Sequence, residues 1–274
     1  MEEISLNEAK LIQIEILKHF DSFCRNHNLN YSLGDGTLIG AVRHKGYIPW
    51  DDDIDVMMLR SEFDKFVKLY ESEGNSKYRL TNKQYGHIHM LQTRLCDTET
   101  KCEFLNYYFK DNVNHGLFID IIPIDHYPDS KDDQIKLLSE IRRYGLIAYL
   151  KNFSLNHLLT DFSNKCSLIK RIGLILIKIL PTSMNFWREK AIKKMCQYNN
   201  VETKQLAEME WWHHQPWVFP RKTFDSYIDL EFEGNMFMAI KDYDTFLTAQ
   251  YGDYMILPPE DKRQLHHTFK AYRK

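Results

Sequence analysis

Apolar residues recur along the chain with two different spacings, which predict where helices and strands lie. A period close to 3.6 residues predicts an amphipathic helix over 6–27, which begins with the capping-box pattern Ser5-x-x-Glu8. Its apolar arc consists of Leu6, Ala9, Ile12, Ile16, Leu17, Phe20 and Phe23. The same spacing predicts further helices at 132–151, 164–180, 185–199 and 242–251.

Shorter apolar runs predict strands. IDVMML at 54–59 indicates one strand, and LFIDIIP at 117–123 is apolar almost throughout, which is typical of a central strand buried on both faces. Other strands are expected at 31–33, 78–81, 88–95 and 224–240, and a short helix at 37–42. A further helix is expected to start at Ser61-x-x-Asp64, with Phe63, Phe66, Val67 and Tyr70 on its apolar face.

Strands and helices alternate up to about residue 128, and helices dominate afterwards. We therefore expect an α/β (α+β) protein whose mixed sheet core lies in a unit at 1–128. A mostly helical unit with a small β element follows at 129–274. The 274 residues suffice for such a protein and its hydrophobic core.

Composition narrows the class of function. With 36 basic and 38 acidic residues, the chain lacks the positive charge of a duplex nucleic-acid binder, so no nucleic-acid partner is expected. Its five cysteines contain no CxxC pair, which favours reduced thiols over disulfides or a zinc site. The N-terminal MEEISLNEAK is not a secretory signal, and the run LIKRIGLILIKIL at 168–180 is too short and too charged to span a membrane.

Negative charge is concentrated in the stretch YSLGDGTLIGAVRHKGYIPWDDDIDV at 31–56. Asp53 and Asp55 share one face of the predicted strand, because side chains on a strand alternate. Asp120 lies alone inside LFIDIIP, where a buried charge is costly unless a metal or partner compensates it. This arrangement suits Mg²⁺, with Mn²⁺ as the alternative. A solvated acidic turn is the other interpretation, whereas a calcium loop would need a glycine where Val56 stands.

The residues that precede the aspartates suit a phosphate. Glycine lets a backbone approach a phosphate closely, and the helix start expected at Gly36 and Thr37 offers free N–H groups to it. Arg43 and Lys45 follow, where they would neutralise a diphosphate opposite the metal or form an exposed basic loop. Together with the aspartates, this turn favours a site for a metal-bound phosphate.

These motifs resemble a known family. The glycine turn, the DxD strand and the later strand aspartate are similar to those of the nucleotidyltransferase superfamily. GTLIGAVRHKGYIPWDDDIDV (36–56) resembles the signature of the LicD family, which includes phosphocholine transferases and fukutin-like proteins. The resemblance continues through FIDIIPID (118–125) to YGDYMILPP (251–259), Arg263 and His266, and thus covers nearly the full length.

The resemblance implies a nucleotidyltransferase-like fold and metal-dependent transfer of phosphocholine from CDP-choline to a sugar hydroxyl. The acceptor would be a lipid-linked oligosaccharide or glycan of the teichoic acid or lipopolysaccharide type. Asp53, Asp55 and Asp120 become the metal ligands, and Asp120 or Asp51 accepts the proton of the attacking hydroxyl.

Donor contacts are expected from the glycine turn and from aromatic residues. Gly36, Thr37, Arg43 and Lys45 would hold the phosphates. Choline is a quaternary ammonium, and aromatic faces bind such cations. Trp50 beside the acidic run has the best position for this, whereas Trp211, Trp212, Trp217 and Tyr251 are candidates either for a choline site or for the core.

A basic segment at 165–204 holds nine Lys or Arg and two Glu. An apolar stripe runs through it, formed by Ile172, Ile175, Leu176 and Ile179. A core helix with a solvated basic face explains the pattern, and so does an interfacial helix on an anionic membrane. The protein is expected in the cytoplasm, and the second interpretation adds peripheral contact with the inner face of the cell membrane.

Other functions share parts of this pattern. Transfer of ribitol phosphate or glycerol phosphate from another CDP-linked donor would use the same site. A glycosyltransferase that uses DxD to hold a nucleotide sugar would not require the glycine turn and the third aspartate. An ATP-dependent antibiotic nucleotidyltransferase would lack YGDYMILPP, and an inactive binding module would not need intact carboxylates.

Overall fold

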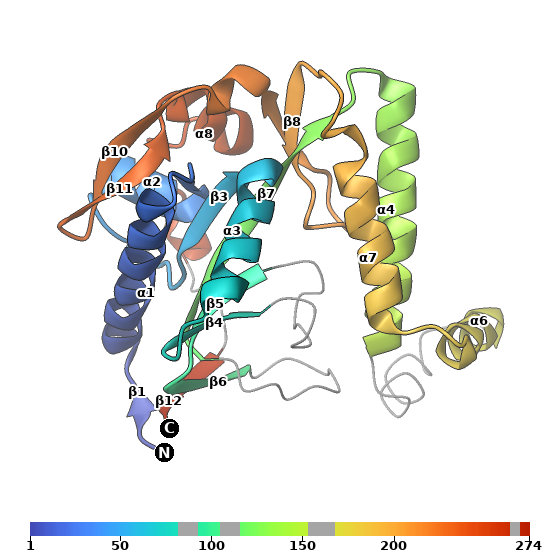
Figure 1. The fold of residues 1–274 in the computed structure, drawn as a ribbon, viewed down its shortest axis with the longest axis horizontal. Helices are drawn as coiled ribbons and strands as arrows, with labels where there is room; N and C mark the ends of the chain where they lie inside the picture. The colour runs from blue at the N-terminus through green and yellow to red at the C-terminus, as the bar shows by residue number, and fades with distance from the viewer. Residues whose placement is uncertain (82–92, 105–115, 153–167, 264–268) are drawn as a thin grey trace.

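A computed structural model describes residues 1–81, 93–104, 116–152, 168–263 and 269–274. Within these ranges the chain is a mixed α/β protein, as the sequence predicts (Figure 1). The first part of the strand expected at 88–95 lies outside the described residues, and so does His266. None of the described helices is long and apolar enough to cross a lipid bilayer.

A mixed sheet forms the centre of the molecule in the order β2–β3–β7–β5–β4, and β8 and β9 extend it beside β7. The strands are β2 (Ser32–Leu33), β3 (Asp55–Leu59), β4 (Tyr78–Thr81), β5 (Thr93–Asp97), β7 (Phe118–Tyr127), β8 (Gln205–Glu208) and β9 (Trp217–Pro220). β3 runs parallel to β7, and the other described neighbours are antiparallel. Residues beyond 128 therefore contribute two strands to the same sheet.

β7 is the central strand, as the apolar run predicts, because it is buried from Phe118 to Asp125. One edge of β7 pairs with β3, and the other pairs first with β5 and then with β8. The strand continues to Tyr127, beyond the predicted end at 123, since β8 supplies hydrogen-bond partners there.

The first helix, α1 (Leu6–Asn26), packs against β5 and β7. The Ser5 hydroxyl accepts a hydrogen bond from the Glu8 N–H at 3.3 Å, which confirms the predicted cap. Leu17 and Phe20 of the predicted apolar arc are fully buried in the main hydrophobic core. The arc is thus the face that docks the helix.

The helix α3 (Arg60–Glu73) packs against β3, β4 and β7. The predicted start at Ser61 is wrong, because β3 runs directly into this helix, which begins at Arg60 without a side-chain cap. Arg60 is held at the start by Asp125, to which its guanidinium donates hydrogen bonds of 2.8 and 2.7 Å. A buried ion pair thus ties the first residue of the helix to β7.

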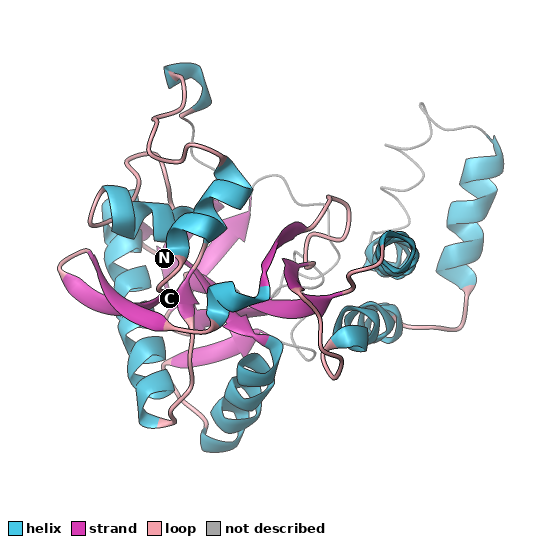
Figure 2. Cartoon of the chain, turned by 90° about the horizontal axis from the view of Figure 1, so that it is seen from above, coloured by secondary structure: helices cyan, strands magenta, loops and turns pink. Residues whose placement is uncertain are grey.

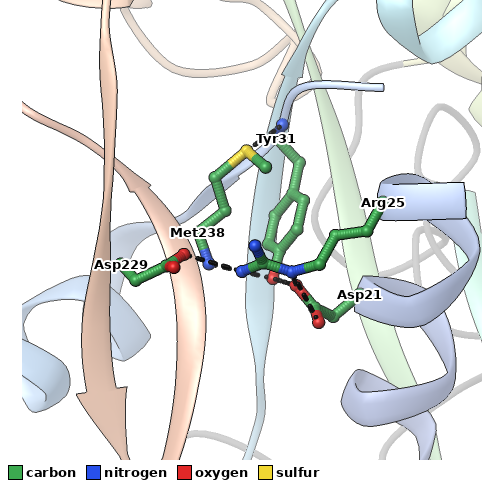
Figure 3. A network of polar contacts seen from close by, with 5 residues as sticks. All are labelled: Asp21, Arg25, Tyr31, Asp229 and Met238. Carbon is green, nitrogen blue, oxygen red and sulfur yellow. Dashed lines mark hydrogen bonds and ion pairs between the residues drawn. The ribbon is translucent and has the colours of Figure 1, made fainter. Parts of the chain in front are cut away.

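A hairpin from the C-terminal half packs beside β2. It consists of β10 (Tyr227–Phe232) and β11 (Asn235–Ile240). Figure 3 shows the polar network that joins it to α1 and to Tyr31, which immediately precedes β2. Arg25 donates to Asp21 at 2.8 Å and to Asp229 at 2.6 Å. Tyr31 donates to Asp21 at 2.8 Å and accepts from the Met238 N–H at 3.1 Å, so the hairpin is fixed against the segment that leads into the glycine turn.

A group of helices lies at one end of the sheet (Figures 1 and 2). Its elements are α4 (Lys131–Asn152), α6 (Leu168–Ile179), α7 (Met184–Met195) and the 3-10 turn η1 (Cys196–Tyr198). The helix expected at 185–199 thus ends at Met195. α4 and α7 pack against each other and bury Leu137 and Ile141, whereas α6 contacts α4 and stands away from the sheet in both views.

A second small sheet, in the order β1–β12–β6, brings the two termini together (Figure 1). Its strands are β1 (Glu3–Ile4), β6 (Thr100–Phe104) and β12 (Phe269–Arg273). The remaining helical elements are α2 (Asp35–Arg43), η2 (Arg221–Phe224), α8 (Tyr243–Tyr251) and η3 (Glu260–Lys262). The sequence patterns did not predict β1, β6, β8, β9 or β12.

Candidate active site

Two aspartates lie side by side at the start of neighbouring parallel strands. Asp55 on β3 is in register with Asp120 on β7. The Asp120 N–H donates to the Ile54 carbonyl at 2.9 Å, and the Asp55 N–H donates to the Thr37 hydroxyl at 2.9 Å. These backbone contacts hold both carboxylates at the same end of the sheet.

Asp53 joins this pair to form a group of carboxylates. One oxygen each from Asp53, Asp55 and Asp120 lies within 4.8 Å of the others, and Asp51 and Asp52 form a second such group with Asp53. The donor set consists of carboxylate oxygens, which Mg²⁺ and Mn²⁺ prefer in proteins. A divalent cation therefore fits the group.

The electrostatics of the group also favour a cation. Burial raises the pKa of Asp53 well above its usual range, and the charges of Asp51 and Asp120 raise it further. Burial, followed by the charges of Asp53 and Asp35, does the same to the pKa of Asp55. A bound cation would reverse these shifts, because it stabilises the charged carboxylates.

The glycine turn supports the aspartates directly. The Gly34 N–H donates to the Asp55 carbonyl at 2.8 Å. A Cβ atom on Gly36 would lie 2.5 Å from the Oδ2 atom of Asp51, so glycine is needed to leave space for that carboxylate. The turn therefore shapes the acidic group, in addition to the phosphate contact expected from the sequence.

The partner of Asp120 is Arg94 on β5, a residue that the sequence analysis missed. Its Nε and Nη2 atoms donate to the two carboxylate oxygens at 2.7 and 3.3 Å. The guanidinium also lies 3.8 Å from the centroid of the Phe118 ring. Arg94 is thus a buried counter-charge that orients Asp120.

The aspartates line a cavity of about 850 Å³, a size typical of a small-molecule site. Most of the predicted site residues line it, namely Gly36, Arg43, Trp50, Asp51, Asp53, Asp55 and Asp120. Thr37 and Lys45 lie elsewhere: Thr37 is buried and holds β3 through its hydroxyl, whereas Lys45 is exposed. The structure thus brings all but two of the predicted residues together.

The C-terminal motif YGDYMILPP forms another wall of this cavity. Arg43 connects the two motifs, because its Nη1 atom donates to the Tyr254 carbonyl at 2.5 Å. The Arg263 guanidinium lies 5.2 Å from the centroid of the Trp50 ring. The two most distant parts of the sequence pattern therefore meet at one site.

The candidate aromatic residues separate into two groups. Trp50, Trp211 and Tyr251 line the cavity, and Trp217 stacks on Tyr251 with ring centroids 6.4 Å apart. Trp212 instead packs in the helical layer, where a Cβ atom on residue 145 of α4 would lie 2.6 Å from its ring. Four of the five aromatic candidates therefore lie at or beside the cavity.

Comparisons with known proteins agree with this geometry. Residues 28–141, which contain every aspartate of the site, match the family described as "LicD/FKTN/FKRP, nucleotidyltransferase domain". The chain is 30% identical to "Lipopolysaccharide cholinephosphotransferase LicD" of Haemophilus influenzae over 99% of both chains. The chain belongs to the LicD family. Membership of the LicD family confirms the resemblance predicted from the sequence and the transferase class of enzyme.

A second relative matches a smaller part of the chain. The chain is 26% identical to an uncharacterized protein of Rickettsia typhi over 45% of this chain and 36% of that protein.

Proposed function

We propose that this LicD-family protein transfers phosphocholine from CDP-choline to a sugar hydroxyl of a cell-surface glycan of the teichoic acid or lipopolysaccharide type. The observation that carries the proposal is the cluster of three carboxylates, from Asp53, Asp55 and Asp120, in a cavity of about 850 Å³. The relative that matches over 99% of both chains is named for phosphocholine transfer to lipopolysaccharide. Aromatic rings beside the carboxylates add a place for the choline group.

In the proposed mechanism, Asp53, Asp55 and Asp120 would hold Mg²⁺ or Mn²⁺, which would supply positive charge to stabilise the donor phosphates and the departing CMP. The acceptor oxygen bonds to the phosphorus that carries choline as the bond to CMP breaks, and Asp51 takes the hydroxyl proton. We assign the proton to Asp51 because both oxygens of Asp120 accept hydrogen bonds from Arg94. Asp120 keeps the role of ligand.

A donor screen tests the proposal. The protein is supplied with Mg²⁺, a glycan acceptor and either CDP-choline, CDP-ribitol, CDP-glycerol or a UDP-sugar, and nucleotide release is measured. We expect CMP release with CDP-choline, and its loss in Asp53→Ala while the circular dichroism spectrum is unchanged. Turnover of a CDP-alditol alone would replace choline as the transferred group, and turnover of the UDP-sugar alone would indicate a glycosyltransferase. Mg²⁺-dependent activity in Asp53→Ala would contradict the ligand assignment.

We further propose that the protein works in the cytoplasm, in peripheral contact with the inner face of the cell membrane. Ile175, Leu176 and Ile179 on α6 are 42%, 54% and 69% exposed, which does not fit the core-helix interpretation. They lie within the basic segment at 165–204, and α6 stands away from the sheet (Figure 2). Exposed apolar side chains beside basic ones suit an anionic bilayer surface.

Vesicle flotation tests the membrane contact. The protein is mixed with vesicles of neutral lipid alone or of neutral lipid with a fraction of anionic lipid. We expect the protein to float with the anionic vesicles, and to do so less when Ile175 and Ile179 are replaced by Ser. The same flotation with both vesicle types, or no effect of the double substitution, would contradict the proposal.

A further inference from the structure

A buried carboxylate without a basic partner lies close to the cavity. Glu208 is the last residue of β8, and 2% of it is exposed. Among the described residues, the Trp211 side chain is the group whose hydrogen bonding stabilises the charged form of this carboxylate, and no basic side chain pairs with it. Burying a carboxylate in this way is costly unless a positive charge or a proton compensates it. The mechanism above gives Glu208 no role.

Neighbouring residues place Glu208 behind the cavity wall. Its register partner on β9 is Trp217, whose ring stacks on Tyr251 with centroids 6.4 Å apart. After burial, the charge of Asp35 contributes most to raising the pKa of Glu208. Asp35, Tyr251 and Trp211, which follows three residues after Glu208, all line the cavity.

The surroundings of Glu208 provide hydrogen-bond acceptors and aromatic rings. Among the described residues, the charged groups that raise its pKa are Asp35 and Glu210, both acidic, whereas a hydrogen bond from the Trp211 side chain lowers it. The Gln250 amide donates to Asp35 at 2.7 Å, which leaves the Gln250 Oε1 atom without a partner in the described part of the chain. This corner of the cavity is therefore rich in negative charge and acceptors.

The ligand that suits such a corner is an organic cation. A quaternary ammonium carries a positive charge, donates no N–H hydrogen bond and binds to aromatic faces. Trp211 and Tyr251 supply the rings, and a bound cation would hold Glu208 in its charged form, in a buried setting where Coulomb attraction is strong. A second metal ion would instead need further oxygen ligands in place of the rings.

We propose that Glu208, behind the rings of Trp211 and Tyr251, provides the counter-charge that holds the cationic head group of the donor and selects it over neutral alcohols. Glu208 acts through this electrostatic attraction and takes no part in bond making or breaking. The inference rests on the proposed function, since it assigns the part of the same cavity that recognises choline. It also predicts a change in affinity that leaves the chemical step intact.

Two donors of the same shape separate charge recognition from a structural role. The first is CDP-choline, and the second is its neutral analogue, in which a tert-butyl group replaces the trimethylammonium group. In Glu208→Gln we expect KM for CDP-choline to rise at least about tenfold with little change in kcat, and KM for the neutral donor to stay within about twofold. Glu208→Asp, which keeps the charge, should recover part of the affinity for CDP-choline.

Glu231→Gln is the control, because it removes an exposed carboxylate on β10 that is not among the groups acting on Glu208. This variant should keep the wild-type ratio of kcat/KM for the two donors. Equal losses for both donors in Glu208→Gln, or no loss for either, would overturn the inference. Thermal unfolding of each variant identifies misfolding, in which case Glu208→Asp carries the test.

A binding measurement separates this inference from the proposed function. Tetramethylammonium is titrated into the wild-type protein while tryptophan fluorescence is followed. Binding that weakens in Glu208→Gln supports the cation subsite even if the wild-type protein turns over none of the CDP-linked donors, a result that would refute only the proposed transfer. Absence of binding to the wild type would overturn the subsite.

Discussion

Repulsion among the carboxylates of Asp53, Asp55 and Asp120 leads to a prediction about protein stability that can be tested without measuring turnover. Asp53→Asn replaces one charged side chain by a neutral one of nearly the same shape. Oxygens of Asp53, Asp55 and Asp120 lie within 4.8 Å of one another, and two charges at about that distance repel by about 3 kcal/mol at an effective dielectric constant of about 20. The raised pKa of Asp53 means that partial protonation already relieves some of this repulsion. We therefore expect metal-free Asp53→Asn to be more stable than the wild type by about 1–3 kcal/mol near neutral pH.

Urea unfolding followed by circular dichroism measures this difference. In EDTA, the midpoint of the variant should be higher with an unchanged slope. Mg²⁺ should then stabilise the wild type through binding to the folded state, and should stabilise the variant less. Glu231→Gln, which alters an exposed carboxylate on β10, is the control and should change neither result. Lower stability of Asp53→Asn in EDTA, or an equal gain from Mg²⁺ in both proteins, would refute the reasoning.

Burial, partly offset by the Gln250 amide, raises the pKa of Asp35 from 3.8 to about 6. A pKa raised by folding means that stability is lost as the pH rises through it, so urea titrations in EDTA should show a falling free energy of unfolding between about pH 4 and 6; a rise would contradict this. Asp125→Ala leaves Arg60 buried without the ion-pair partner now 2.7 Å away, which should lower the free energy of unfolding by about 3–5 kcal/mol in the same assay; a loss below about 1 kcal/mol would argue against it. Gly36→Ala places a Cβ atom 2.5 Å from Asp51 and should reduce kcat by up to about 100-fold with an unchanged circular dichroism spectrum; a wild-type kcat would show that the turn tolerates the methyl group.

Sequence patterns predicted the carboxylates because their signal is local. Asp53 and Asp55 stand two residues apart beside an apolar run, and Asp120 interrupts another, so each can be recognised without knowledge of the fold, although β3 itself begins only at Asp55. The helix α1 and the central strand β7 were predictable for the same reason, since a helical period defines the first and a continuous apolar run the second.

Residues whose role depends on strand pairing could not be predicted. Arg94 meets Asp120 because β5 pairs with β7 in one register, and nothing in the sequence of β5 indicates that register. Glu208 lies beside the cavity because β8 joins the free half of the same edge of β7. The start of α3 was placed one residue late because the helix follows β3 directly and has no side-chain cap that the sequence could reveal.

The contact between Arg43 and the Tyr254 carbonyl spans 211 positions of the chain. During synthesis, Asp53, Asp55 and Asp120 leave the ribosome long before the segment that forms the other wall of the cavity. A growing chain therefore carries the acidic group without the surface that surrounds a donor. The active site is among the last parts of the molecule to become complete, so a chain truncated before YGDYMILPP would retain the aspartates and lose the enclosure that confines the reaction.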